Sequence, residues 1–213
     1  MRNNPVLDPD VEKGEGVPIS AIIFGGRRSD TMPLVFQALD WIHGVYAGAT
    51  MASETTAAAT GAVGQVRRDP MAMLPFCGYS MGNYFRHWLE IGPRLQNPPL
   101  IFHVNWFRKG ADGKFLWPGF GDNMRVLQWI ISRCEGKIGA DESPIGFVPN
   151  PDDLDLDEIQ GFSKEQLGEL LAVKPDEWKA ELAGQAKFFE TLKPDMPERL
   201  LSEWEKVAKR FGS

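Results

Sequence analysis

The feature that most constrains this chain is a change of pattern near residue 150. Residues 18–150 contain short apolar runs that end at glycine or proline, as expected for buried strands and short helices joined by tight turns. Residues 151–213 are helical in pattern and interrupted by prolines, with 15 acidic against 9 basic residues. Residues 1–17 are polar and aperiodic. The sequence therefore predicts an α/β (mixed α+β) domain with an extended lead-in at 1–17, a body at 18–150 and a helical tail at 151–213 of the same domain.

Composition narrows the class of protein. The chain has 213 residues, of which 43% are hydrophobic and 24% charged, which is typical of one soluble globular domain. A net charge of -6 without a basic stripe argues against a nucleic-acid partner. No apolar run reaches the roughly 18 residues of a spanning helix, so no membrane insertion is expected. Cys77 and Cys134 form no CxxC pair and no signal peptide precedes them, which predicts a reduced, cytoplasmic protein.

Individual elements follow from local periodicity. Ile19–Phe24 is an apolar run stopped by Gly25 and Gly26, and Leu100–Phe107 alternates, so both predict strands. Residues 82–92 predict an amphipathic helix, and a second helix runs to Cys134 with Asp122 or Asn123 as its cap. Residues 32–51 are expected to be buried, but their mixture of β-branched, aromatic and small residues favours neither strand nor helix.

An aromatic-rich stretch, FHVNWFRKGADGKFLWPGFGDN, occupies residues 102–123. Aromatic side chains in a stretch otherwise rich in glycine and charge suit a planar base, because stacked rings attract each other beyond simple burial. Phe107, Phe115 and Phe120 are the candidate walls, and the Asn123 amide can donate to a guanine O6 or accept from its N1 and N2 hydrogens. The alternative is that these aromatics fill core beneath a long hairpin.

Two arginine pairs are candidate anion sites. Arg27 and Arg28 follow the glycine pair, where a guanidinium can meet phosphate or carboxylate oxygens; the alternative is a pair of solvated side chains. Arg67 and Arg68 are weaker candidates because Asp69 can pair with one of them. The nearby run SETT, residues 53–56, contains groups that can orient a ligand but indicates no mechanism.

Other catalytic patterns are missing from the sequence. His43, His87 and His103 form no HxxxH pair and stand among apolar and aromatic residues, so each is expected to be a core or interface residue. No metal site is predicted. No GxxxxGK[ST] phosphate loop occurs in the 213 residues, so this stretch alone lacks the parts of a phosphoryl-transfer site.

Several strings, in order, resemble the C-terminal part of GTP-dependent phosphoenolpyruvate carboxykinase. They are PISAIIFGGRR, MPLVFQALDWIHGV, SETTAAA, DPMAMLPFCGY, HWL, IFHVNWFRK, GKFLWPGFGDN and PIGFVP. The resemblance runs from about Val17 to Pro149, with a tail similar in character only. It implies a lyase of gluconeogenesis, a decarboxylase that converts oxaloacetate and GTP to phosphoenolpyruvate, GDP and CO2. It also implies a nucleotide-binding domain in which residues 102–123 form the guanine-binding loop.

The resemblance assigns roles to particular residues. It implies that Phe107, Phe115 and Phe120 form the guanine pocket with Trp106 beside it and Asn123 as the amide that reads the base. Arg27 is implied to contact the triphosphate and to stabilise charge during transfer. The family's phosphate loop and its ligands for Mn2+, and for Mg2+ with the nucleotide, match nothing in this chain. The remainder of the enzyme is therefore expected N-terminal to this segment, and the isolated chain is expected to be inactive. The alternative is a noncatalytic guanine-nucleotide-binding or interaction module.

Overall fold

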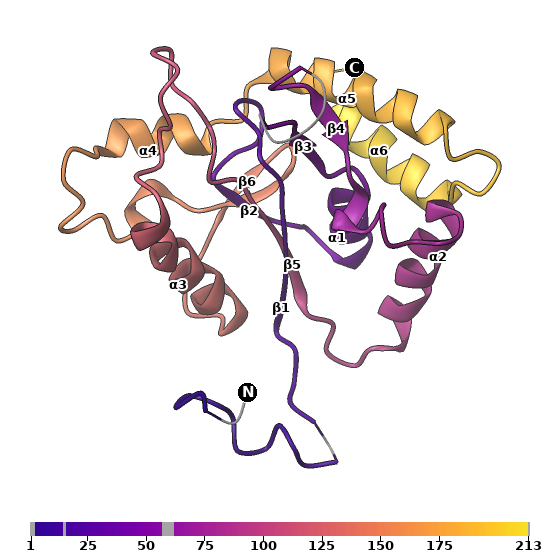
Figure 1. The fold of residues 1–213 in the computed structure, drawn as a ribbon, viewed down its shortest axis with the longest axis horizontal. Coiled ribbons are helices and arrows are strands. Elements are labelled where there is room, and N and C mark those ends of the chain that lie inside the picture. Colours follow the sequence, from indigo (N-terminus) through magenta and orange to yellow (C-terminus); the bar gives the residue numbers. More distant parts are fainter. Residues whose placement is uncertain (1–2, 15, 57–61, 213) are drawn as a thin grey trace.

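The computed structural model of the protein describes residues 3–14, 16–56 and 62–212. Parts of the lead-in and of the stretch SETTAAATGAVGQ lie outside these ranges. The described lead-in, residues 3–14, forms successive turns and lies away from the body (Figure 1). None of the described helices is long and apolar enough to cross a membrane.

A five-stranded mixed sheet organises the body. Its strands lie in the order β1-β5-β2-β7-β6. β1 and β5 are parallel and in register, with Gly25 opposite Val104, and the other neighbours are antiparallel. A separate hairpin pairs β3 with β4. The strands are β1 (Ala21–Gly25), β2 (Val35–Gln37), β3 (Ala52–Glu54), β4 (Val66–Arg68), β5 (Leu100–Val104), β6 (Asp141–Ser143) and β7 (Gly146–Val148).

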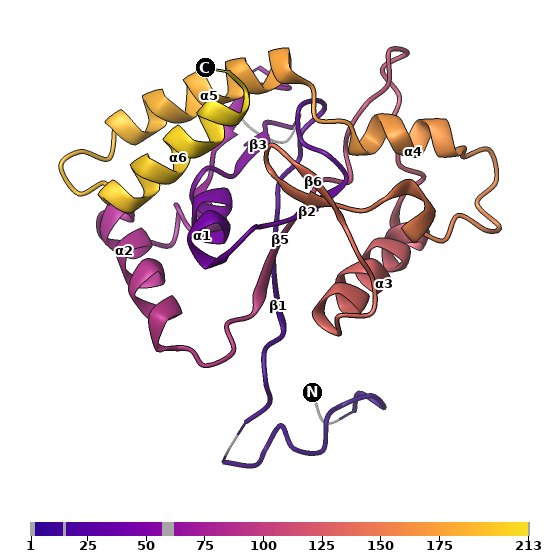
Figure 2. The ribbon, with the colours of Figure 1, turned by 180° about the vertical axis from the view of Figure 1, so that it is seen from behind.

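Helices cover both faces of this sheet. Figures 1 and 2 show α1, α2, α5 and α6 on one side and α3 and α4 on the other. Side-chain alternation along β5 explains the two layers, since Ile101 packs in the first core whereas Phe102 and Val104 pack in the second. The helices are α1 (Trp41–Ala49), α2 (Met81–Ile91), α3 (Asn123–Cys134), α4 (Lys164–Leu171), α5 (Pro175–Glu190) and α6 (Glu198–Arg210). The predicted α/β class is confirmed.

The segment that periodicity left open, residues 32–51, contains both a strand and a helix. β2 is fully buried, and α1 begins where the Asp40 carboxylate accepts a hydrogen bond from the His43 N–H at 2.8 Å. Glycines allow α1 to lie directly against the sheet: a Cβ on Gly44 would come within 2.4 Å of Ile101, and one on Gly48 within 2.6 Å of Phe24. Close packing therefore decided this helix more than its amphipathicity did.

The periodic helices agree with prediction better than the strand ends do. α2 and α3 confirm the helices expected at 82–92 and up to Cys134. The strand expected at Leu100–Phe107 ends at Val104 instead. Residues 151–212 contain three α-helices, two of which start at or directly after a proline, Pro175 and Pro197.

Candidate ligand-binding site

The two sequence features with ligand-binding character meet at one edge of the sheet. β1 and β5 are parallel, so their carboxyl ends lie together, at Gly25 and Val104. GGRR continues from β1 and NWFRK continues from β5. In open α/β sheets ligands bind outside the carboxyl ends of parallel strands, and the structure places both features there.

The turn after β1 is held by the start of the β3–β4 hairpin. The Arg27 N–H donates to the Ser53 hydroxyl at 3.0 Å, and the Glu54 N–H donates to the Arg27 carbonyl at 2.8 Å. The Glu54 carboxylate accepts both the N–H and the hydroxyl of Ser29, at 2.6 and 2.7 Å. A Cβ on Gly26 would lie 2.2 Å from the Ala52 carbonyl oxygen, so only glycine permits this approach. Residues 53–54 thus fix the arginine turn, a role that the sequence did not reveal.

Arg27 and Arg28 have different environments although they are neighbours. Arg28 is buried, and its guanidinium pairs with the Glu181 carboxylate of α5 at 2.9 Å. Glu181 also pairs with Arg68, so two cations share one buried carboxylate. Burial alone would raise the pKa of Glu181, but Arg28 and Arg68 outweigh it and hold that pKa below its usual value. Arg28 and Arg68 are structural, and Arg67 pairs with Asp69 at 3.3 Å as expected.

Arg27 instead lies over an aromatic ring. Its guanidinium carbon is 4.6 Å from the centroid of the Phe107 ring, which is cation–π geometry. Both side chains line a pocket of about 330 Å³ together with Trp106, Ser53 and Glu54. The structure therefore brings together the arginine of one sequence feature and two aromatics of the other.

A buried amide explains why β5 ends where it does. Asn105 is fully buried; its amine donates to the carbonyls of Arg28 and Met32, at 2.9 and 3.0 Å. Its carbonyl oxygen accepts the backbone N–H groups of Arg28 and Phe107, each at 3.2 Å. Asn105 therefore joins the two loops of the pocket. Sequence reasoning missed this residue, and the available signal was a polar residue between an apolar strand and two aromatics.

Of the two remaining aromatic candidates, Phe115 and Phe120, only Phe115 contacts Phe107. Phe115 meets Phe107 edge to face with a centroid distance of 5.8 Å, across a hairpin that projects beyond α4 (Figure 1). A second hollow, of about 310 Å³, adjoins both rings, Arg27 and Lys109. Phe120 is 93% exposed, and no ring contact joins it to the other aromatics that the structure describes. Two of the three predicted walls are thus in contact, and the third is free in solvent.

Asn123 is the first residue of α3 and has a defined partner. Its carbonyl oxygen accepts the indole N–H of Trp117 at 2.8 Å. Asp122 occupies the N-cap position of α3, as expected, but its carboxylate makes no capping hydrogen bond and pairs with Arg125 at 3.0 Å instead. Trp117 is buried between Phe162, at 5.6 Å, and Trp106, at 6.5 Å, which links Asn123 to the pocket wall.

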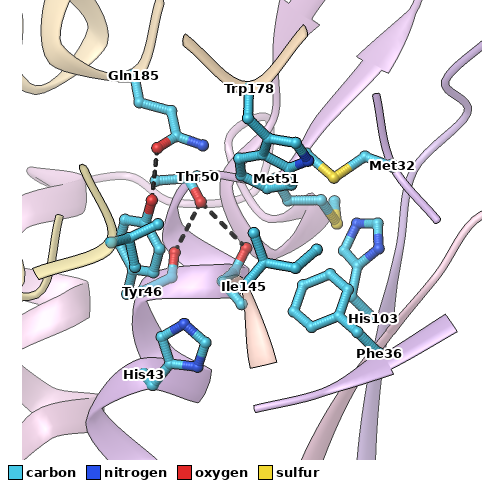
Figure 3. A pocket seen from close by; sticks show the side chains of 12 residues that line it. Met32, Phe36, His43, Tyr46, Thr50, Met51, His103, Ile145, Trp178 and Gln185 are labelled. Carbon is cyan, nitrogen blue, oxygen red and sulfur yellow. Dashed lines mark hydrogen bonds between the residues drawn. The ribbon is translucent and has the colours of Figure 1, made fainter. Parts of the chain in front are cut away.

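Two histidines, His43 and His103, line a small internal cavity and do not line the pocket that contains Arg27 and Phe107. Figure 3 shows His43 and His103 among the residues that line this cavity. Burial lowers the pKa of each to about 4, so both are neutral near pH 7. His87 lies on an exposed part of α2 and is therefore not a core residue, so only the interface position expected for it stays a prediction. Across the described ranges there is no cluster of three histidine, cysteine, aspartate or glutamate side chains that could hold a metal ion.

An open mixed sheet, covered by helices on both faces and carrying a pocket at the ends of its parallel strands, defines an α/β ligand-binding domain. The model of the phosphoenolpyruvate carboxykinase C-terminal P-loop domain family matches residues 1–210. The chain therefore belongs to the family of GTP-dependent phosphoenolpyruvate carboxykinases and matches the C-terminal portion of that enzyme.

Curated relatives agree with the family model. The chain is 54% identical over 209 residues to phosphoenolpyruvate carboxykinase (GTP) of Anaeromyxobacter dehalogenans, covering 98% of this chain and 35% of the relative. The enzyme of Thermoplasma volcanium is 51% identical over 212 residues, and that of Renibacterium salmoninarum 52% over 209, covering 100% and 97% of this chain and 35% and 34% of the relatives. The chain spans about a third of their length. These matches extend through the helical tail, so the expected limit at Pro149 is wrong.

Proposed function

We propose that this chain supplies the guanine pocket and one phosphate-contacting arginine of a GTP-dependent phosphoenolpyruvate carboxykinase. The reaction is oxaloacetate + GTP = phosphoenolpyruvate + GDP + CO2. The observation that carries the proposal is the contact of Arg27 with Phe107, because it places a fixed cation beside an aromatic face in one pocket. Family membership supports the reaction class.

The roles follow from the chemistry of each group. Trp106, Phe107 and Phe115 offer ring faces to a purine, and Phe120, exposed just before α3, closes on the base when it binds. Arg27 meets the triphosphate, where a guanidinium stabilises charge that persists throughout phosphoryl transfer. Asn123 reads the guanine edge. The other phosphate contacts and the oxaloacetate site are assigned to residues outside these 213.

The metal ligands of the enzyme are not among the residues of this chain that we assign to the site. The residues described here do not fit a manganese site, since they form no cluster of three ligating side chains. We propose that the ligands of Mn2+, and the phosphate loop that meets the Mg2+ nucleotide, belong to sequence outside this chain. The two cysteines are free thiols, which supports a cytoplasmic location.

Ligand titrations of the complete gene product that contains this chain test the proposal. Phe107→Ala is expected to weaken guanosine, GDP and GTP alike, because it removes a surface for the base. Arg27→Ala is expected to weaken GTP by about tenfold or more while changing guanosine little, since a charge-assisted contact to phosphate is lost. Lys137→Ala, an exposed residue in the loop after α3, is the matched control. Equal losses for guanosine and GTP on Arg27→Ala, or no guanine preference in the unmodified protein, would contradict the proposal.

A further inference from the structure

Trp117 fixes the direction in which the Asn123 amide faces. An indole N–H is a donor only, so the atom of Asn123 at 2.8 Å from it must be the carbonyl oxygen. The side-chain NH2 group of Asn123 makes no hydrogen bond to any other residue that the structure describes, and it remains free to donate. Trp117 itself is 2% exposed and held between Phe162 and Trp106, so it cannot turn away.

We infer that Trp117 is a positioning residue for purine selection. Its hydrogen bond to the Asn123 carbonyl oxygen holds the side-chain amide of Asn123 in one orientation, with the NH2 group toward the ligand. This inference rests on the proposed function of the site. A guanine or hypoxanthine O6 accepts from that amine, whereas the adenine 6-amino group is itself a donor. With the Asn123 amide held in this orientation, the adenine 6-amino group would face the Asn123 NH2 group, and two donors cannot form a hydrogen bond with each other.

The opposite orientation of the Asn123 amide is also disfavoured by its contact with Trp117. If Asn123 rotated by half a turn to accept from adenine, its side-chain NH2 would face the Trp117 N–H, and the buried indole N–H would lose its acceptor. Discrimination therefore depends on a residue that need not touch the base. Phe162, in the segment before α4, packs edge to face on Trp117 and so helps to hold the indole in place.

The test is Trp117→Phe in the complete gene product, with affinities for GTP, ITP and ATP. ITP keeps the O6 acceptor and lacks the 2-amino group, so the ratio of ITP to ATP affinity reports the reading of position 6 alone. Phenylalanine keeps ring packing but removes the N–H. We expect both the GTP to ATP and the ITP to ATP ratios to fall by about tenfold, mainly through tighter ATP binding.

Controls separate this inference from the proposed function. Trp204→Phe removes an indole N–H that donates to the Leu182 carbonyl at 3.2 Å on the far helices, and it should leave both ratios unchanged. Unchanged ratios in folded Trp117→Phe, or an equal fall in Trp204→Phe, overturn this inference. Asn123→Ala tests the pocket itself: loss of guanine preference there, with Trp117→Phe unchanged, would leave the proposed function standing. If Trp117→Phe does not fold, 3-benzothienylalanine at position 117 replaces the N–H with sulfur at nearly the same shape.

A second observation independently concerns the cavity in Figure 3. The cavity holds about 20 Å³, and its lining includes two buried polar atoms without a hydrogen-bond partner among the described residues, His103 Nδ1 and Trp178 Nε1. One water needs roughly 10–15 Å³ of such space and two or more polar neighbours. Trp178 can only donate, and neutral His103 can accept at Nδ1.

We propose that one water binds in this cavity, accepting from Trp178 of α5 and donating to His103 of β5. It would join the helical tail to the strand that leads into NWFRK. A crystal structure that shows ordered waters should place one within hydrogen-bond distance of both atoms, and nitrogen NMR should find His103 protonated at Nε2 only. A dry cavity, or protonation at Nδ1, overturns the proposal.

Discussion

At the scale of single residues, the neighbouring Arg27 and Arg28 have different roles because their side chains meet different partners. Arg28 points into the body, where Glu181 and Arg68 complete a desolvated group of charges. Arg27 points toward the pocket and contacts Phe107. Removing a charge-assisted contact to a buried carboxylate costs more than losing a partly exposed cation.

Arg28→Ala is therefore expected to lower the free energy of unfolding by about 1.5–3 kcal/mol, since Glu181 keeps Arg68 but loses its charge-assisted contact with Arg28. Arg27→Ala, the matched neighbour, should cost less than about 1 kcal/mol, the value of an exposed cation–π contact. Urea denaturation followed by circular dichroism measures both. Similar losses for the two variants would contradict the division of roles.

At the scale of elements, the short strand β3 acts as a brace for the arginine turn. Ser53 and Glu54 bind the backbone of Arg27 and the side chain and backbone of Ser29. Two adjacent residues of one strand thus determine where the Arg27 guanidinium lies.

Glu54→Ala should weaken GTP binding by about tenfold, because the turn loses its acceptor and Arg27 loses its position. The double variant with Arg27→Ala should lose little more than Arg27→Ala alone, since both changes remove one function. Glu54→Gln, which keeps one carbonyl acceptor, should restore part of the affinity. Glu142→Ala on β6 is the exposed control. Additive losses in the double variant would show that Glu54 does not act through Arg27.

At the scale of the whole molecule, two neutral histidines connect folding to pH. His43 lies on α1 near Arg210, Lys206 and Asp40, and burial is the main cause of its low pKa. His103 lies on β5 near Arg28 and Glu181, and burial again dominates. Each titrates at about 4 in the fold against an ordinary value of 6.5, so the unfolded chain binds more protons between these values.

Stability contributed by these histidines is therefore complete above pH 6.5 and is lost as the pH falls toward about 4. The loss reaches at most about 3 kcal/mol for each histidine. His103→Gln should flatten the dependence of unfolding free energy on pH in this window, as measured by urea titrations at several pH values. An unchanged slope in His103→Gln would contradict the assignment.

The sequence by itself determined the features that depend on near neighbours. Periodicity predicted α2 and α3, the apolar run before Gly25 predicted β1, and the ordered strings predicted the family. Hydrophobic period and turn chemistry act over a few residues, so one sequence contains them. The guanine-pocket residues remain a prediction, but the meeting of Arg27 with Phe107 makes that prediction specific.

Tertiary structure decided what distant partners provide. Only the fold brings Glu181 of α5 to Arg28, Ser53 and Glu54 to the arginine turn, and Asn105 between the two loops. It also determined that β5 stops at Val104 and that Trp117, not a helix end, engages Asn123. These outcomes depend on burial and on the need of buried polar groups for partners, and neither is visible until separate segments pack together.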